Sequence, residues 1–249
     1  MKITPEICID SYESSLNVNQ TVAKRVELCS SLDVGGLTPS VGLVKLIKKN
    51  TDLIIFSLIR PRSGNFIYNK EEKATILSEI KSLISAGVDG LVVGALTPQF
   101  TIDIEFMKEI KSVAKNIPLV FHRAFDQLID PYEGVRQLIK LGFIRILTSG
   151  QKANAFEGKE LLKDLISKFG EQITIMPGGG VRVENVLELV EYTKCKEIHF
   201  SAKTSYLNAP KISGKVNFNT YSTPENKISI SQIKDINAMI KQIKKARQF

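Results

Sequence analysis

The segment Met176-Pro177-Gly178-Gly179-Gly180-Val181-Arg182 follows an apolar run at 173–175 and precedes a helical pattern. Three glycines therefore stand where a strand is expected to pass into a helix N-terminus. Glycines let backbone N–H groups approach a ligand closely, and the positive end of a helix dipole favours anions. About one strand unit later, the segment Glu197-Ile198-His199-Phe200-Ser201-Ala202 also ends in small residues. The loops after strands seven and eight of an α/β barrel commonly bind phosphate, so Gly178, Gly179, Gly180, Ser201 and Ala202 are candidate anion-binding residues.

The number of strands supports a barrel. Short apolar or β-branched runs recur eight times, at 7–9, 25–29, 53–59, 90–93, 119–122, 144–148, 173–176 and 197–200. The segments between them carry apolar residues at helical spacing, which predicts alternating strands and helices and therefore parallel strand pairing. A length of 249 residues without a Ser/Gly-rich or Pro-rich linker fits one domain. We predict a single (β/α)8 TIM barrel over residues 1–249.

Local signals mark several helix ends. Thr38-Pro39, Thr97-Pro98 and Asp130-Pro131 each place a capping side chain before a proline that suits the first helical position. Gly87 and Gly142 fall where helices should end, just before the next strand. These signals predict three helix starts and two helix ends.

The net charge of +8 is concentrated near the C-terminus. Residues 227–249 hold six basic side chains and one acidic one, so residues 1–226 carry 28 basic against 25 acidic groups. Isoleucines in this terminal stretch form one stripe at helical spacing, which predicts an amphipathic outer helix over 230–247 with a solvated lysine face. We therefore expect no nucleic-acid or membrane partner. The polar stretch 207–228 has no sustained periodicity, and we expect a mobile connection there rather than a lid.

The chain has three cysteines and no apolar run as long as a membrane span, and we expect no secretory leader. These features are typical of a soluble protein in a reducing cytoplasm.

Strand parity predicts a polar barrel interior. If the isoleucines of the first strand face the helices, the side chains that alternate with them face the barrel axis. The predicted inward residues of the first two strands are Glu6, Cys8, Asp10, Arg25, Glu27 and Cys29. Buried charges need partners, and we expect Arg60, Arg62 and Arg123 to supply them. Glu6 and Arg25, near the strand starts, are expected to form a structural pair.

Cys8 and Cys29 are predicted at equivalent positions near the ends of two neighbouring strands. Such strands lie about 4.8 Å apart, so two inward thiols can share a soft ion. Two thiolates without a zinc-type ligand spacing suit Cu(I). The alternative is that both cysteines are small core fillers, which is common for free cysteine.

A second set of residues is compatible with an enzyme. Glu27, Arg60 and the group His122-Arg123-Ala124-Phe125-Asp126 stand near the catalytic face of the predicted barrel. A carboxylate, an imidazole and guanidinium groups there can converge on an anionic substrate, with Glu27 or His122 moving a proton. The candidate catalytic residues are Glu27, His122, Arg60, Arg123 and Asp126. The alternative is an ion-pair cluster that only braces the barrel. The parity of His199 is ambiguous.

Several ordered motifs between residue 5 and Ala202 resemble the signature of the CutC copper-homeostasis family. They are Glu6-Ile7-Cys8-Ile9-Asp10-Ser11-Tyr12-Glu13-Ser14, Arg25-Val26-Glu27-Leu28-Cys29-Ser30, Gly35-Gly36-Leu37-Thr38-Pro39-Ser40, Ile59-Arg60-Pro61-Arg62, Phe121-His122-Arg123-Ala124-Phe125-Asp126, Leu147-Thr148-Ser149-Gly150-Gln151 and Met176-Pro177-Gly178-Gly179-Gly180-Val181. The resemblance implies a cytoplasmic TIM barrel that handles copper, with Cu(I) ligands at Cys8 and Cys29. It also implies a homo-oligomer, either a dimer or a tetramer. The chain departs from the family pattern at Ser63-Gly64-Asn65-Phe66, where the family has Gly-Gly-Asp-Phe, and at Val22-Ala23-Lys24, where it has Gly-Ala-Asp.

Two functions therefore stand as predictions. The first is copper homeostasis through Cu(I) binding at Cys8 and Cys29. The alternative is an enzyme that acts on a phosphorylated or otherwise anionic small molecule. A scaffold without a small ligand is a third possibility. The barrel fold hosts many chemistries, so the fold does not choose among them, and whether the chain is an enzyme stays open.

Overall fold

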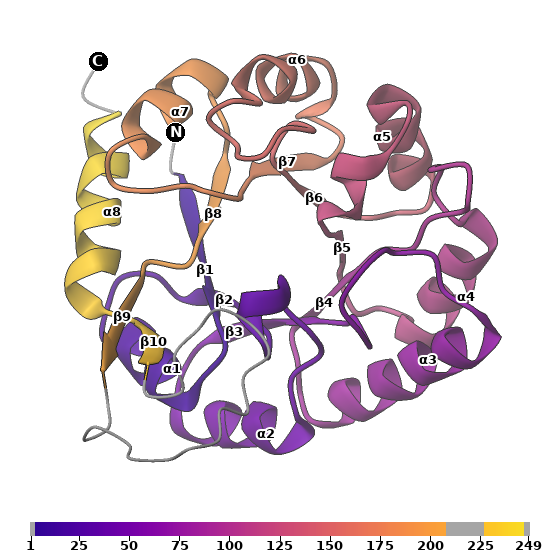
Figure 1. Ribbon diagram of the computed structural model, residues 1–249, viewed down its shortest axis with the longest axis horizontal. Coiled ribbons are helices and arrows are strands. Elements are labelled where there is room, and N and C mark those ends of the chain that lie inside the picture. The colour runs from indigo at the N-terminus through magenta and orange to yellow at the C-terminus, as the bar shows by residue number, and fades with distance from the viewer. Residues whose placement is uncertain (1–2, 208–226, 247–249) are drawn as a thin grey trace, which may run out of the picture.

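A computed structural model describes residues 3–207 and 227–246. Eight parallel strands form a nearly closed barrel surrounded by helices, as Figure 1 shows. The strands are β1 (Thr4–Ile9), β2 (Arg25–Leu28), β3 (Ile54–Leu58), β4 (Gly90–Val93), β5 (Leu119–Phe121), β6 (Arg145–Thr148), β7 (Thr174–Pro177) and β8 (Glu197–Phe200). Each overlaps one of the eight predicted runs, which confirms the predicted TIM barrel.

The helices lie on the outside of the ring of strands (Figure 1). They are α1 (Tyr12–Asn19), α2 (Val41–Asn50), α3 (Lys70–Ser85), α4 (Ile104–Ala114), α5 (Pro131–Lys140), α6 (Lys159–Phe169), α7 (Val186–Thr193) and α8 (Ile233–Lys245). Two short 3₁₀ helices, η1 (Leu32–Val34) and η2 (Arg123–Gln127), follow β2 and β5. Within residues 3–207 and 227–246 we find no helix with the length and apolar character that crossing a bilayer needs.

The backbone ladder runs in the order β7-β6-β5-β4-β3-β2-β1-β8. The first strand is therefore an interior strand, paired with β2 on one side and with β8 on the other. The strands β7 and β8 stand at the two ends of this order and lie side by side, but no strand pairing joins them in the described part of the chain.

Two apolar layers follow from strand parity. Outward side chains such as Ile7, Ile9 and Val26 join the large core between strands and helices. Inward side chains form a separate cluster inside the barrel, which contains Cys8, Cys29, Phe56, Leu58, Val92 and Val120. The barrel interior is thus apolar on the β3–β5 side and carries thiols on the β1–β2 side.

One of the three predicted helix starts is correct. Asp130 caps α5 by accepting hydrogen bonds from the backbone N–H groups of residues 132 and 133, with Pro131 at the first helical position. The predictions at Thr38 and Thr97 are wrong, because α2 and α4 begin two and six residues later than predicted, capped by Ser40 and Asp103.

The hydroxyls of the two threonines are already engaged. Thr38 donates to Glu79 at 2.7 Å, and Thr97 shares a hydrogen bond with Thr101 at 2.7 Å. Both predicted helix ends are confirmed, since Gly87 and Gly142 follow α3 and α5 with φ of +92° and +75°.

After β8 the chain forms an antiparallel pair that the sequence analysis did not predict. The strands are β9 (Lys203–Leu207) and β10 (Lys227–Ser231), and they bracket residues 208–226. Most of the predicted mobile connection at 207–228 therefore lies outside the described residues. Ser231 is hydrogen-bonded to α1, where its N–H donates to Ser14 Oγ at 3.2 Å, and its carbonyl accepts from Asn17 at 3.1 Å.

The C-terminal helix was predicted over 230–247 and is observed as α8. Residues 230 and 231 belong to β10 instead, so the helix begins at Ile233. Ile236, Met239, Ile240 and Ile243 are buried on one face of α8, which confirms its amphipathic character. The helix packs against α7 and α1.

Candidate functional site

A buried ion-pair network occupies the part of the barrel near the strand starts. Arg25 Nε lies 2.8 Å from Glu6 Oε2, as predicted for a structural pair. Arg145 Nη1 lies 3.6 Å from the same Glu6 oxygen, and both arginines also pair with Glu197. His199 Nδ1 lies 3.0 Å from Glu6 Oε1. Burial would raise the pKa of Glu6, but His199 and the two arginines lower it to about 2.

The predicted partners of these buried charges are wrong. Arg62 pairs with Glu72, while Arg60 and Arg123 have other acceptors, described below. The partners are Arg145 and His199, which come from β6 and β8. Arg145 is the first residue of β6, as Arg25 is of β2, and strand parity applied to β6 could have indicated that Arg145 points inward.

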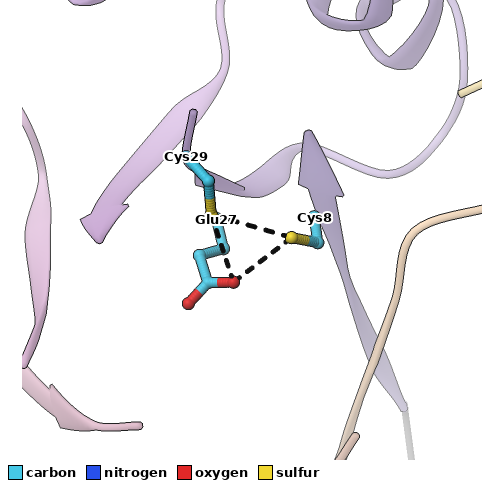
Figure 2. Close-up of side chains that lie close together, drawn as sticks. All are labelled: Cys8, Glu27 and Cys29. Atoms are coloured by element: carbon cyan, nitrogen blue, oxygen red, sulfur yellow. Dashed lines mark hydrogen bonds between the residues drawn. The ribbon is translucent and has the colours of Figure 1, made fainter. Parts of the chain in front are cut away.

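Cys8, Glu27 and Cys29 meet inside the barrel. The two sulfurs are 3.8 Å apart, and Glu27 Oε2 lies 3.3 Å from Cys8 Sγ and 3.7 Å from Cys29 Sγ. All three residues are buried. Figure 2 shows the three side chains pointing toward one another from β1 and from the end of β2. Their ligand atoms lie close enough to hold one metal ion, and Glu27 is a third candidate ligand that the sequence analysis did not assign to a metal.

The two cysteines do not occupy equivalent positions. In the β1–β2 register Cys8 lies opposite Glu27, and Cys29 comes two residues further along the chain. Cys29 nevertheless belongs to the same side of the pleat as Glu27, since residues two apart along an extended chain share a face. The predicted closeness of the thiols is thus confirmed, although the predicted register is wrong.

The hydrogen bond between the two sulfurs shifts the pKa values of the two thiols in opposite directions. It lowers the pKa of Cys8 to about 5, with His199 acting in the same direction. The same bond, together with burial, raises the pKa of Cys29 well above its usual value. Burial and the nearby Cys8 charge also raise the pKa of Glu27. Cys8 is therefore the group that ionises first, and Cys29 keeps its proton.

His199 joins the thiol group to the ion-pair network. Its Nδ1 faces Glu6 and its Nε2 lies 3.6 Å from Glu27 Oε2. Burial would lower the pKa of His199, but Cys8 and the two carboxylates raise it well above the usual value. An imidazolium at this position offsets the negative charge of the Cys8 thiolate.

A cavity of about 810 Å³ opens at the carboxyl ends of the strands. It brings together many of the predicted site residues, together with His199. Those that line it are Cys8, Glu27, Arg60, His122, Arg123, Gly179, Gly180, Ser201 and Ala202. Cys29, Asp126 and Gly178 are not among its lining residues.

Arg60 is held by backbone carbonyls. Its guanidinium donates to the carbonyls of Val34 and Gly36 at 3.0 Å and of Gly64 at 2.9 Å, and lies over the Phe66 ring. These contacts fix the loops after β2 and β3 around one positive charge. Burial lowers the pKa of Arg60 from its usual high value.

His122 is buried beside Arg60 and acts as the cap of η2. Its Nδ1 accepts a hydrogen bond from the backbone N–H of Ala124 at 3.1 Å. Burial and the Arg60 charge lower the pKa of His122 to about 3, so the imidazole is neutral at pH 7. A neutral ring whose Nδ1 accepts carries its hydrogen on Nε2. This Nε2 has no hydrogen-bond partner among the described residues.

Arg123 and Asp126 form a rigid unit after β5. Arg123 Nε donates to Asp126 Oδ2 at 2.8 Å, and Nη2 donates to Ser149 Oγ at 2.7 Å. Asp126 also accepts from the backbone N–H groups of Ser149 and Gln151 and from the hydroxyl of Thr148. Its oxygens are thus occupied in joining the loops after β5 and β6.

The glycine loop after β7 does not lead directly into a helix. The helix α7 begins at Val186, six residues after Gly180, and has Asn185 as its cap position. The predicted helix dipole behind the glycines is therefore wrong. Gly179 and Gly180 have φ of +94° and +66°, and an ideal Cβ on Gly179 would lie 2.9 Å from Arg123 Nη1. The loop needs glycine there because the guanidinium lies directly against it.

Comparisons with known proteins agree on one family. The model described as "CutC family" matches residues 3–204. A CutC family protein of Histophilus somni is 40% identical over 223 residues, covering 90% of this chain and 92% of that protein. The human copper homeostasis protein cutC homolog is 40% identical over 200 residues, covering 80% of this chain and 73% of that protein. A crystal structure titled as CutC from Streptococcus agalactiae has a TM-score of 0.77 and 34% identity, covering 80% of this chain and 98% of that one.

Proposed function

We propose that this chain, which belongs to the CutC family, acts in copper homeostasis by binding Cu(I) through Cys8 and Cys29. The observation that carries the proposal is the distance of 3.8 Å between the two buried sulfurs. Metal–thiolate bonds are about 2.3 Å long in zinc sites, so sulfurs up to about 4.6 Å apart can contact one ion. The spacing of the two thiols fits a shared metal ion.

The donor set favours a soft metal. Thiolate sulfur is the ligand type that Cu(I) prefers, whereas a carboxylate oxygen suits harder ions. Glu27 lies within reach of both sulfurs, but its raised pKa favours the protonated form. Its part in the proposal is to keep the two thiols together rather than to bind the ion.

The ion enters through the cavity. Cys8 lines the cavity and Cys29 does not, so Cys8 is the sulfur that an incoming ion meets first. Cys8 is also the thiol with the lowered pKa, and a thiolate is the form that binds metals. Binding to Cys29 displaces its proton, since metal ligands must be deprotonated. We place this binding in the cytoplasm, where the three free cysteines stay reduced.

An anaerobic titration with Cu(I) in competition with a chromogenic chelator tests the proposal. We expect one tightly bound ion per wild-type chain. The Cys8→Ser and Cys29→Ser variants should each lose the tight site, because either change leaves a single sulfur. Cys195→Ser is the matched control, since Cys195 is also a buried free thiol but lies outside the Cys8–Glu27–Cys29 group.

The control variant should bind copper as the wild type does. Absence of tight binding in the wild type would overturn the proposal. So would tight binding that either the Cys8 or the Cys29 substitution leaves unchanged.

A further inference from the structure

The cavity is much larger than copper binding requires. Its volume of about 810 Å³ falls in the range of about 300–1,000 Å³ that is typical of pockets for small organic ligands. An ion held by two sulfurs would occupy a small part of it. The loop after β7, which also lines the cavity, carries a second group of polar atoms that the copper proposal does not use.

Arg123 is oriented toward this loop. Its Nε and Nη2 are occupied by Asp126 and Ser149, which hold the guanidinium in one plane. The remaining Nη1 has no acceptor in the described part of the chain and lies against Gly179, on the cavity lining. An arginine that two side chains hold in place offers its third nitrogen at little cost in conformational entropy.

In the glycine loop, the N–H groups of Gly180 and Val181 point away from the residues that hydrogen-bond the loop's carbonyls. The carbonyl of Gly179 accepts from the N–H of Ala155 at 2.9 Å, and the carbonyl of Gly180 accepts from Asn185 at 3.0 Å. A trans peptide points its C=O and N–H in opposite directions, so the N–H groups of Gly180 and Val181 point away from these partners. Neither N–H has a protein acceptor among the described residues, and both residues line the cavity.

The charges around the cavity favour an anion. Arg60, Arg123, Arg182 and Lys203 line it, against three acidic residues. Lys203 is paired with Asp10, whereas Arg182 forms no ion pair within the described residues. A positive Nη1 and two backbone N–H groups, all from residues that line the cavity, match the several terminal oxygens of a tetrahedral oxyanion.

We propose that the cavity binds a small phosphate monoester, with its phosphate group held by Arg123 Nη1 and by the N–H groups of Gly180 and Val181. The organic part of the ligand extends toward the polar group around Cys8 and His199, which lines the same cavity. Apolar contacts for it come from Leu32, Leu58 and Phe66. The site does not depend on a bound copper ion.

Isothermal titration calorimetry of the metal-free full chain at low salt, in a phosphate-free buffer, tests the proposal. The probes are inorganic phosphate and glycerol 3-phosphate, a simple phosphate monoester. We expect both to bind at one site per chain and to compete with each other. The ester should bind at least as tightly as inorganic phosphate, because the cavity leaves room for its organic part.

The central variant is Arg123→Gln, which should weaken both affinities by about tenfold or more, because it removes a charge-assisted hydrogen bond. The matched control is Arg136→Gln on α5, which also removes an arginine paired with a carboxylate but lies outside the cavity. Its affinities should stay within twofold of the wild type. Cys29→Ser should also leave both affinities unchanged, which separates this site from the copper site.

Gly179→Ala is a second variant in case Arg123→Gln fails to fold. Its new methyl group would collide with the guanidinium, so binding should be lost while circular dichroism shows an intact fold. The proposal is overturned if the wild type binds neither probe or if Arg123→Gln binds them as the wild type does. Binding of inorganic phosphate with exclusion of glycerol 3-phosphate would also overturn it.

Discussion

The neutral state of buried His122 gives the stability of the protein a defined pH dependence. Its pKa is about 3 in the folded chain against a usual value of 6.5. Below pH 6.5 the unfolded chain therefore takes up a proton at this residue that the folded chain does not, and stability falls. The contribution is fully present above pH 6.5 and is lost as the pH falls toward 3.

The magnitude follows from the two pKa values. Between pH 6 and pH 5 the unfolded imidazole holds most of a proton that the folded imidazole lacks, and this difference in bound protons costs the folded state about 1.2 kcal/mol over the interval. His199, with its raised pKa, acts in the opposite direction, because its folded form already holds the proton. Because the unfolded imidazole is also mostly protonated below pH 6.5, the His199 contribution changes little between pH 6 and pH 5 and does not cancel that of His122.

The variant His122→Asn removes the titration and keeps a cap, because the amide oxygen can accept the hydrogen bond of Ala124 as Nδ1 does. Urea unfolding of the metal-free chains at pH 6 and pH 5 gives the free energy of unfolding of each. We expect the wild type to lose about 1.2 kcal/mol relative to the variant between these pH values. Carboxylates common to both chains contribute equally and drop out of the difference.

Val120→Ala is the control, since it removes apolar volume inside the barrel without changing any titratable group. Its destabilisation should be the same at both pH values. If the difference between wild type and His122→Asn also stays constant from pH 6 to pH 5, His122 protonates equally in both states. The argument from its burial would then be refuted.

Two further predictions concern stability and are checked by urea unfolding at pH 7. Arg145→Leu should lower the free energy of unfolding by about 3–5 kcal/mol, because it leaves the buried Glu6 carboxylate with less compensating charge. The control Arg136→Leu, on the exposed face of α5, should lower it by less than about 0.5 kcal/mol. Equal losses of stability in the two variants would contradict the buried network. Gly90→Ala should cost about 1–3 kcal/mol, because its Cβ would collide with the ring of Phe56 in β3. Gly42→Ala in α2 should stabilise by about 1 kcal/mol, because its Cβ would meet only Ser40 Oγ, at 3.9 Å. A gain at position 90 would show that the ring moves aside.

The fold was accessible from the sequence because the barrel repeats one signal eight times. Each predicted run overlaps a strand, and even β5, the shortest strand of the barrel, falls within the run at 119–122. Helix starts were less accessible, because a threonine before a proline looks the same whether its hydroxyl caps a helix or, as at Thr38, bonds another side chain. The β9–β10 pair was missed because its two strands are separated by a long polar stretch.

Part of the candidate site could also be predicted from the sequence. Parity along one strand predicts which side chains point inward, and it placed Cys8, Glu27 and Cys29 inside the barrel. It does not say which inward residues of distant strands meet, because that depends on the tilt and stagger of the whole barrel. The partnership of Glu6 with Arg145 and His199, from strands far along the chain, could therefore not be derived from local patterns.

The position of β1 inside the ladder has a consequence for synthesis on the ribosome. Chains emerge from their N-terminus, so β1 and β2 are available to pair long before residues 197–200 of β8 exist. Until then β1 has an open edge, and the two thiols lack the imidazole of His199 beside them. Before β8 is made, the cysteine pair thus lies beside an open strand edge, and pairing of the last strand with β1 encloses it in the barrel.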